Sequence, residues 1–456
     1  MDKSLASRCR ELLQFLSTTK GDLANVTGPP SMLAPLSVVE VGRCWAQRPA
    51  VFSAAAFETE ADRRCLAVLR MVLIALRTQL YIGGSPTTSI KKPLNAFLGE
   101  MFLAEWEQPP HTPKRGHASN VSNASNASGA SCTSSCGDNL SRSTTTSTAP
   151  SVLSTSSSSH HAKANTQAKT RLVAEQVSHH PPITAMHIAD EANGVRADGY
   201  ARVEMTFNGA VNVRQVGHAI MRIDAYDEEY LIPLPAIKVR GFLSGRLYPE
   251  ITDVYHIVGT SGYSAEIKFS GQGVAWGGKR NAFVAKVFNR QKQVVFTVDG
   301  VWSQGWTVTD KSGKVIETYD VDAPENDAAP ISLPPIDKQD PWESRRAWAG
   351  VLEGLETGNL GQTVAEKTKI EQAQRRMRAR EAADGDTWTP LLFASDSAAS
   401  TAAAETFRRL SKAVPTSGGA GLELHDGRTK GVWRVVDAKA KNIQRPLRGS
   451  TTPLGV

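Results

Sequence analysis

Apolar and polar residues alternate through most of the chain between residues 171 and 322. The alternation is clearest in four segments, at residues 211–215, 219–223, 283–287 and 294–298. Because successive side chains point to opposite faces of a strand, this pattern predicts many consecutive strands with no helix between them. We therefore expect one large antiparallel sheet. Closing that sheet into a barrel would remove its exposed edges and could enclose a ligand.

Apolar residues at helical spacing predict helices on both sides of the strand region. One helix is expected over residues 61–80, where Arg70 and Arg77 interrupt the apolar run and favour a buried or half-buried helix over a membrane span. Two more are expected over residues 341–356 and 363–382. Beyond them the chain is basic and rich in Ala, Ser and Gly, which predicts a loose tail.

The N-terminal residues predict a short amphipathic helix. Its apolar positions are spaced three to four residues apart, at Leu5, Cys9, Leu12, Leu13 and Leu16. The breaker Gly28-Pro29-Pro30 separates this helix from the following chain. Three roles stay open for it: packing on its own domain, a movable lid, or a helix on a membrane surface.

A tract of Ser, Thr, Asn and Ala extends from residue 108 to about residue 170. Such a composition cannot bury enough apolar area to offset the entropy of ordering, so we predict a disordered insertion. The flanking segments 102–106 and 171–175 both resemble strands. The insertion is therefore expected to be the tip of a long hairpin.

Charge and cysteine content narrow the possible partners and the compartment. The formal net charge of +7 favours anionic partners, but zinc-finger spacing, basic-region heptads and an RNA-binding signature are all missing, so we do not expect nucleic acid binding. The first 20 residues lack a secretory signal, and the cysteine count of five is odd, which favours the cytosol. Cys132 and Cys136 have no second pair, so no metal site is expected.

The most specific string in the chain is Glu175-Gln-Val-Ser-His-His-Pro-Pro182. Adjacent histidines in a strand point to opposite faces, but the two prolines that follow break the pairing, so both rings could lie near one rim. His179 and His180 alone are compatible with metal ligands, an acid/base pair, or donors to an anion. Metal binding needs further ligands, and no set with usable spacing is present in the sequence.

This string resembles the fingerprint of the oxysterol-binding protein family. Other segments also resemble that family, including Gly28-Pro-Pro30, Lys92-Pro-Leu-Asn-Ala-Phe-Leu-Gly-Glu100 and Glu343-Ser-Arg-Arg-Ala-Trp348. The chain is most similar to the short fungal members, which lack a pleckstrin-homology domain. The resemblance implies a mainly β (α+β) fold, in which a near-complete antiparallel barrel holds one lipid in a tunnel. A helical lid and a C-terminal helical subdomain complete that fold.

The resemblance implies a phosphoinositide head-group site at the mouth of the tunnel. Its residues would be Lys92, Asn95, His179, His180, Lys367, Glu371 and Arg375. Lys367, Glu371 and Arg375 have i, i+4, i+8 spacing, which by itself indicates a solvated salt-bridge ladder on one helix face. Lys92, Lys367 and Arg375 would supply positive charge to the phosphates, and Glu371 would orient the last two.

The resemblance also implies a sterol site deeper in the tunnel. Trp45, Gln79, Gln215, Val203 and Val239 would contribute to it, and Leu12, Leu16 and Leu23 would close it as part of the lid. Two positions depart from the pattern of the short sterol-binding members: Leu80 replaces a Tyr, and Ala201 replaces an Asn. Tyr81 is a candidate to compensate for the first change.

The expected function is non-vesicular transfer, in which a sterol is exchanged for phosphatidylinositol 4-phosphate between membranes. Alternatives are exchange of phosphatidylserine for phosphatidylinositol 4-phosphate, or a lipid sensor without bulk transfer. A hydrolytic site at His179, His180 and Glu371 is disfavoured because no nucleophile is paired with a base. We expect a non-enzymatic, cofactor-free cytoplasmic monomer that contacts anionic membranes of the Golgi, endoplasmic reticulum or plasma membrane.

These inferences divide the chain into six segments. They are the lid at 1–29, the helical segment and first strands at 30–106, the insertion at 107–170, the barrel core at 171–325, the C-terminal helices at 326–395 and the basic, partly disordered tail at 396–456.

Overall fold

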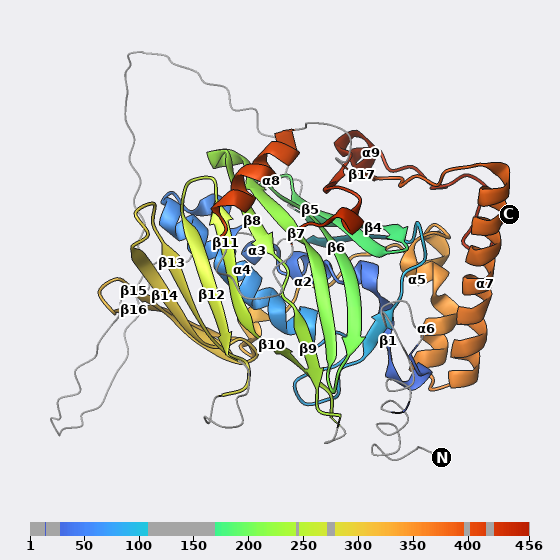
Figure 1. The fold of residues 1–456 in the computed structure, drawn as a ribbon, viewed down its shortest axis with the longest axis horizontal. Helices are drawn as coiled ribbons and strands as arrows, with labels where there is room; N and C mark the ends of the chain where they lie inside the picture. Colours follow the sequence, from blue (N-terminus) through green and yellow to red (C-terminus); the bar gives the residue numbers. More distant parts are fainter. Residues whose placement is uncertain are drawn as a thin grey trace, which may run out of the picture. The chain divides into compact units, whose positions relative to one another are not determined.

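A 14-stranded sheet dominates the described part of the chain (Figure 1). The computed structural model describes Gln14 and residues 28–107, 169–242, 246–270, 279–395, 402–415 and 424–455. The strands of this sheet are β3 (Met101–Glu107), β4 (Lys169–His179), β5 (Pro182–Asp190), β6 (Val195–Phe207), β7 (Val211–Ile223), β8 (Glu228–Pro233), β9 (Ile237–Arg240), β10 (Tyr248–Ile251), β11 (Asp253–Gly259), β12 (Ser264–Ser270), β13 (Ala282–Phe288), β14 (Val294–Val301), β15 (Gly305–Asp310) and β16 (Val315–Asp320).

The strands pair antiparallel and mostly in chain order, as the alternating pattern predicts. The predicted segments 211–215 and 219–223 are the two halves of a single strand, β7. Val211–Val213 of β7 pair with β9, whereas His218–Ile223 pair with β8. The hairpin of β9 and β10 therefore lies beside the main path of the sheet, and β11 pairs with β8.

The two ends of the sheet, β16 and β3, are joined by the closing segment, residues 321–343. Ser332 exchanges two backbone hydrogen bonds with Glu105 of β3, at 2.8 and 3.2 Å. Met101 N donates to Trp342 O at 3.0 Å. Within the described residues β16 and β3 do not pair with each other, so the barrel is near-complete rather than strictly closed. This confirms the fold class predicted from the sequence.

The predicted hairpin around the insertion is confirmed at its base. β3 and β4 pair antiparallel from Met101↔Glu175 to Glu107↔Lys169. The rest of the insertion lies outside the described residues.

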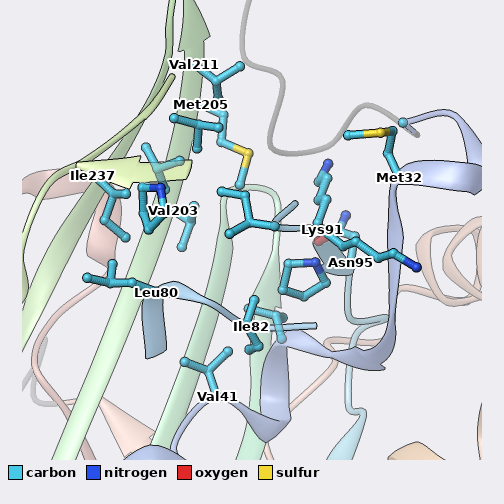
Figure 2. A pocket seen from close by; sticks show the side chains of 18 of the residues that line it. Met32, Val41, Leu80, Ile82, Lys91, Asn95, Val203, Met205, Val211 and Ile237 are labelled. Atoms are coloured by element: carbon cyan, nitrogen blue, oxygen red, sulfur yellow. The ribbon is translucent and has the colours of Figure 1, made fainter. Parts of the chain in front are cut away.

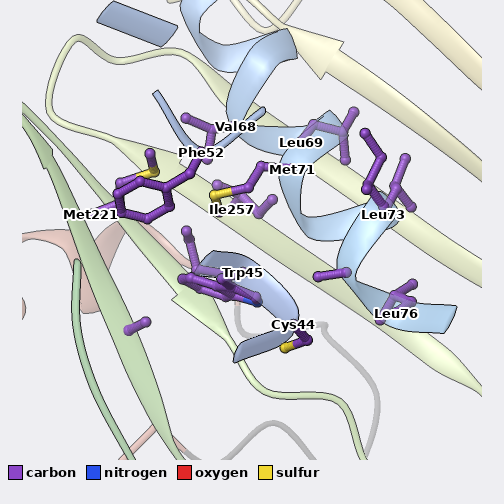
Figure 3. Packing of buried hydrophobic residues seen from close by; sticks show 14 of the residues in the cluster. Cys44, Trp45, Phe52, Val68, Leu69, Met71, Leu73, Leu76, Met221 and Ile257 are labelled. Atoms are coloured by element: carbon purple, nitrogen blue, oxygen red, sulfur yellow. The ribbon is translucent and has the colours of Figure 1, made fainter. Parts of the chain in front are cut away.

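Short elements and one long helix precede β3. They are η2 (Pro30–Met32), β1 (Leu33–Ser37), η3 (Val38–Glu40), α2 (Arg43–Ala46), α3 (Pro49–Phe52), η4 (Ala54–Phe57), α4 (Ala61–Leu80) and β2 (Lys92–Leu94). Helix α4 has the predicted bounds and packs its apolar face against β12 and β13. Figure 3 shows Leu69 and Leu73 of α4 in the same cluster as Trp45 of α2 and Ile257 of β11. This cluster joins α2 and α4 to the strands of the sheet.

The predicted C-terminal helices are confirmed, with slightly different bounds. They are α5 (Ser344–Ala347), α6 (Ala349–Glu356) and α7 (Leu360–Asp384). Three short 3-10 helices lie in connections elsewhere: η5 (Asp224–Tyr226), η6 (Pro324–Asn326) and η7 (Ile336–Lys338). The Asn359 side chain caps α7 by accepting a hydrogen bond from Gln362 N. Gly385 ends the helix at φ 74°, a conformation that glycine adopts without strain.

The chain beyond residue 395 differs from the predicted loose tail. Its described residues form α8 (Ala402–Ala413), η8 (Gly427–Thr429), β18 (Trp433–Val435) and α9 (Asp437–Lys441), and β18 pairs with β17 (Phe393–Ser395). Leu410, Trp433 and Leu447 are buried against other parts of the fold. A few large apolar side chains are sufficient to anchor this segment although its average composition is polar.

The predicted lid lies outside the described residues, including Leu12, Leu16 and Leu23. Cys132 and Cys136 also lie outside them. No helix in the described ranges has the length and apolar character needed to cross a membrane.

Candidate functional site

A cavity of about 250 Å³ opens between the sheet and the segment that leads into β3. One water needs roughly 10–15 Å³ by such a measure, so the cavity has room for a ligand of many atoms. Figure 2 shows Val203, Met205, Val211 and Ile237 on the strand side, with Lys91, Asn95 and Met32 on the opposite side. Val41, Leu80 and Ile82 lie at one end.

The interior of the cavity is mainly aliphatic. Four residues predicted for a sterol site, Gln79, Val203, Gln215 and Val239, line it. Sequence reasoning missed other lining residues, among them Met205, Phe242 and Leu247. The alternation in β6 could have identified Met205, because it is two residues from Val203 and shares its face.

Gln215 is already hydrogen-bonded within the protein. Its Nε2 atom donates to Pro235 O at 2.7 Å. Proline has no backbone N–H to donate, so regular strand pairing is interrupted at Pro233 and Pro235. The Gln215 side chain supplies one hydrogen bond in its place. Its Oε1 atom is the group that could accept a hydrogen bond from a ligand.

The structure does not bring Trp45 to the cavity. Trp45 is buried in the main core beside Phe52 and Met71 (Figure 3). Tyr81 is also directed elsewhere, since its ring packs against Trp302 with centroids 6.0 Å apart. Leu80 lines the cavity and Tyr81 does not, so the structure does not support the prediction that Tyr81 compensates for Leu80.

Lys91, Lys92 and Asn95 form the polar side of the cavity. They are held there by β2, which pairs parallel with β1 through Leu33↔Lys92 and Ser37↔Leu94. The fully buried Leu94 side chain anchors the segment that carries both lysines and Asn95. Lys91 is exposed, and was not predicted as a site residue.

A β-bulge in β4 determines where the histidines point. Gln176 pairs with Thr184 and His179 pairs with Pro182, so β4 has one extra residue over this stretch. Gln176, Thr184 and Pro182 all line the cavity. His179 therefore shares the inner face with Gln176, although regular alternation would place residues 176 and 179 on opposite faces.

The two histidines lie edge to face, with ring centroids 4.8 Å apart and an interplanar angle of 71°. His179 is half-buried and its Nδ1 atom is 3.0 Å from Ala96 O, next to Asn95. His180 is exposed. Burial, and then the neighbouring His180, lower the pKa of His179, while Ala96 O and the Glu371 carboxylate oppose that shift.

Helix α7 brings Lys367 and Glu371, two residues of the predicted ladder, to the same region. The Lys367 side chain is 8% exposed, and its ammonium group donates a hydrogen bond to Glu371, one turn further along the helix. Glu371 acts electrostatically on His179, so the histidines and this helix face are brought together. Arg375 is exposed, one further turn along α7.

The arrangement places cations and histidine rings beside an apolar cavity. Such a site can hold an anionic group at its mouth and an apolar group inside. No group of three or more His, Cys, Asp or Glu side chains in the described residues could hold a metal ion.

Comparisons with known proteins identify relatives of this chain. A family model described as "Oxysterol-binding protein" matches residues 11–351. The "Probable transporter efuK" of Hormonema carpetanum is 36% identical over 449 residues, 97% of this chain, and the chain spans 54% of that relative's length. "Protein kes1" of Schizosaccharomyces pombe is 29% identical over 85% of this chain and 87% of its own length.

Two solved structures share the fold at low sequence identity. The Osh1 ORD domain in complex with cholesterol has a TM-score of 0.60 and 18% identity, covering 87% of this chain and 85% of that chain. The Osh3 ORD in complex with PI(4)P, from Saccharomyces cerevisiae, has a TM-score of 0.56 and 16% identity, covering 87% of this chain and 88% of that chain.

Proposed function

This chain belongs to the oxysterol-binding protein family, and from that premise we propose that it carries lipids between membranes, exchanging a sterol for phosphatidylinositol 4-phosphate. The observation that carries the proposal is a single cavity with an aliphatic interior and a polar side formed by Lys91, Lys92 and Asn95. The Osh1 domain was solved in complex with cholesterol and the Osh3 domain in complex with PI(4)P, which supports the same pair of ligands.

The interior removes the main barrier to moving a sterol. A sterol exposes roughly 400 Å² of apolar surface, which costs on the order of 10 kcal/mol in water at about 25 cal/mol per Å². Val203, Met205 and Val239 offer an apolar wall in place of water. Transfer then needs no bond to be broken, and we propose no chemical step.

The mouth suits a phosphorylated head group. A phosphomonoester carries close to two negative charges near neutral pH, so several cations are needed to bind it. We propose that Lys91, Lys92 and Lys367 supply charge, with His179 and His180 as donors. Glu371 keeps the Lys367 ammonium in place through their ion pair.

We propose that the cavity accepts either lipid but not both, so that each encounter with a membrane can exchange one for the other. The direction of net sterol transport then follows the phosphoinositide gradient. We propose that the protein acts in the cytoplasm and contacts anionic membrane surfaces transiently.

A vesicle assay tests the exchange directly. Transfer of a fluorescent sterol between vesicles is measured with and without phosphatidylinositol 4-phosphate in the acceptor vesicles, and we expect faster transfer when it is present.

The double variant His179→Ala/His180→Ala should lose phosphoinositide extraction and keep sterol binding, whereas His256→Ala, on β11, should behave like the unchanged protein. If the double variant loses phosphoinositide extraction and sterol binding equally, the proposal is contradicted.

A second candidate is exchange of phosphatidylserine for phosphatidylinositol 4-phosphate. It is favoured by Leu80, which gives the cavity an aliphatic side chain, and by Tyr81, which packs on Trp302 instead. Mass spectrometry of lipids that co-purify with the protein discriminates the two candidates. Binding without transfer between vesicles would instead indicate a lipid sensor.

A further inference from the structure

We infer that residues 445–453, the C-terminal brace, fix the distance between the histidines of β4 and the Lys367–Glu371 pair of α7, and thereby position the head-group site. The inference rests on the proposed function of that site. The brace lies beyond the residues matched by the family model, 11–351, so family membership does not assign it this role.

The first contact of the brace is an ion pair with the strand that carries the histidines. The Glu175 carboxylate is completely buried and accepts hydrogen bonds from Leu391 N at 2.7 Å and Leu392 N at 2.8 Å. Arg448 Nη2 donates to it at 3.1 Å. Burial raises the pKa of Glu175, and these donors and Arg448 oppose the shift. Arg448 is therefore the cation that compensates a buried carboxylate four residues before His179.

The second contact is with the loop between β2 and β3. The Arg448 guanidinium lies 5.3 Å from the Trp342 ring centroid and 5.1 Å from that of Trp388. A Cβ atom at Gly99 would lie 3.2 Å from the Trp342 ring and 3.5 Å from Arg448 Nε. Arg448 of the brace, together with Trp342 and Trp388, is thus packed directly on the loop whose Ala96 carbonyl oxygen is bonded to His179.

The third contact reaches helix α7. Pro453 O accepts a hydrogen bond of 2.8 Å from Gln374 Nε2. Gln374 is three residues after Glu371, so it lies about one turn from the ion pair at the mouth. The brace therefore touches both elements that the head-group site requires.

The brace is itself firmly attached between these contacts. Leu447 N donates to Asp340 Oδ2 at 2.9 Å, and Trp342 Nε1 donates to Thr451 O at 2.7 Å. Arg445 forms an ion pair with the buried carboxylate of Glu343 at 2.5 Å. A binding site built from two separate elements needs such support, because errors of about 0.5 Å in the position of its groups already weaken binding.

The test compares Arg448→Gln with Arg428→Gln, a matched change at an exposed arginine that pairs with Glu204. We expect Arg448→Gln to weaken binding of phosphatidylinositol 4-phosphate in vesicles by about tenfold and to change sterol affinity by less than about twofold. Arg448→Lys keeps the charge but not the planar group between the rings, so it should restore part of the affinity. Arg428→Gln should leave both affinities unchanged. If Arg448→Gln lowers the affinities for the phosphoinositide and for the sterol by the same factor, the inference is overturned.

Amide hydrogen exchange gives a readout that does not depend on the ligand. In Arg448→Gln we expect faster exchange in residues 176–180 and 371–375 than in Arg428→Gln. Unchanged exchange in both segments would also overturn the inference. If the unchanged protein does not bind the phosphoinositide, the proposed function fails, and exchange in these segments still decides whether the brace positions them.

Discussion

The Nδ1 atom of His179 lies 3.0 Å from the carbonyl oxygen of Ala96. A carbonyl oxygen only accepts, so Nδ1 carries the proton in this hydrogen bond. In the neutral ring Nε2 is then an acceptor, and it becomes a donor only when the imidazole is protonated. His179 can therefore donate from Nε2 to a phosphate only in its charged form.

This geometry predicts that head-group affinity depends on pH. Burial lowers the pKa of His179 in the free protein, and a bound phosphate should raise it, so affinity should increase as pH falls from 8 towards 6. Phosphate itself gains a proton near pH 6, which limits the useful range. Titration calorimetry at several pH values measures the slope. His179→Gln should flatten it, His256→Gln should not, and an equal slope in both variants would argue against the role of His179.

Filling the cavity should abolish sterol binding without unfolding the protein. Val239 lines the cavity and pairs with Val211, another lining residue, so Val239→Trp projects a large ring into the space. We expect sterol affinity to fall by more than about tenfold, with a change in melting temperature of a few degrees. Val284→Trp, at a position that is 43% exposed, is the matched control. Retained sterol binding in Val239→Trp would mean that the sterol occupies a different place.

Glu100 should make stability depend on pH near neutrality. Its buried carboxyl accepts hydrogen bonds from Trp348 Nε1 at 2.8 Å and Ser344 Oγ at 2.7 Å, and burial raises its pKa to about 7. Between about pH 4.5 and 7 the folded protein retains a proton that the unfolded chain has released. The stabilising contribution is therefore present at low pH and is lost as pH rises through 7.

The variant Glu100→Gln removes this titration. Relative to it, the free energy of unfolding of the unchanged protein should fall by up to about 3 kcal/mol between pH 4.5 and 8. Urea denaturation followed by tryptophan fluorescence measures the difference. Glu356→Gln, an exposed change at the end of α6, should retain the pH dependence of the unchanged protein.

Replacing residues 110–167 with a short glycine-rich turn should leave lipid binding intact. β3 and β4 pair up to Glu107↔Lys169, so a hairpin turn can connect them directly. Circular dichroism and a sterol-binding assay check the result. An unfolded product would show that the insertion is required for the core, and a folded product that does not bind would give it a part in the site.

Local patterns were sufficient for helix α4 and for the hairpin of β3 and β4. Helix α4 was predicted with its observed bounds because its apolar residues recur at helical spacing over five turns. The hairpin of β3 and β4 was also predicted, because both of its strands have strong local signals. The fingerprint string predicted that His179 belongs to a site, and this rested on family resemblance rather than on spacing.

Other features depend on contacts between distant residues. The bulge in β4 is a mismatch in length between two strands, and the sequence of β4 alone does not show it. Trp45 lies in the core because α2 packs on α4, which no local pattern reveals. The C-terminal segment is ordered through partners such as Glu175, more than 250 residues earlier in the chain.

The closing segment has a mechanical consequence for the barrel. Neighbouring strands such as β6 and β7 are held by a long ladder, whereas the closing segment bonds to β3 through Ser332 and Trp342 in the described residues. The circumference is therefore held by few hydrogen bonds at this junction, as it also is between β8 and β11, which pair at two positions. We expect a bulkier cargo to be accommodated by widening at these short junctions, while long ladders such as that of β6 and β7 stay intact.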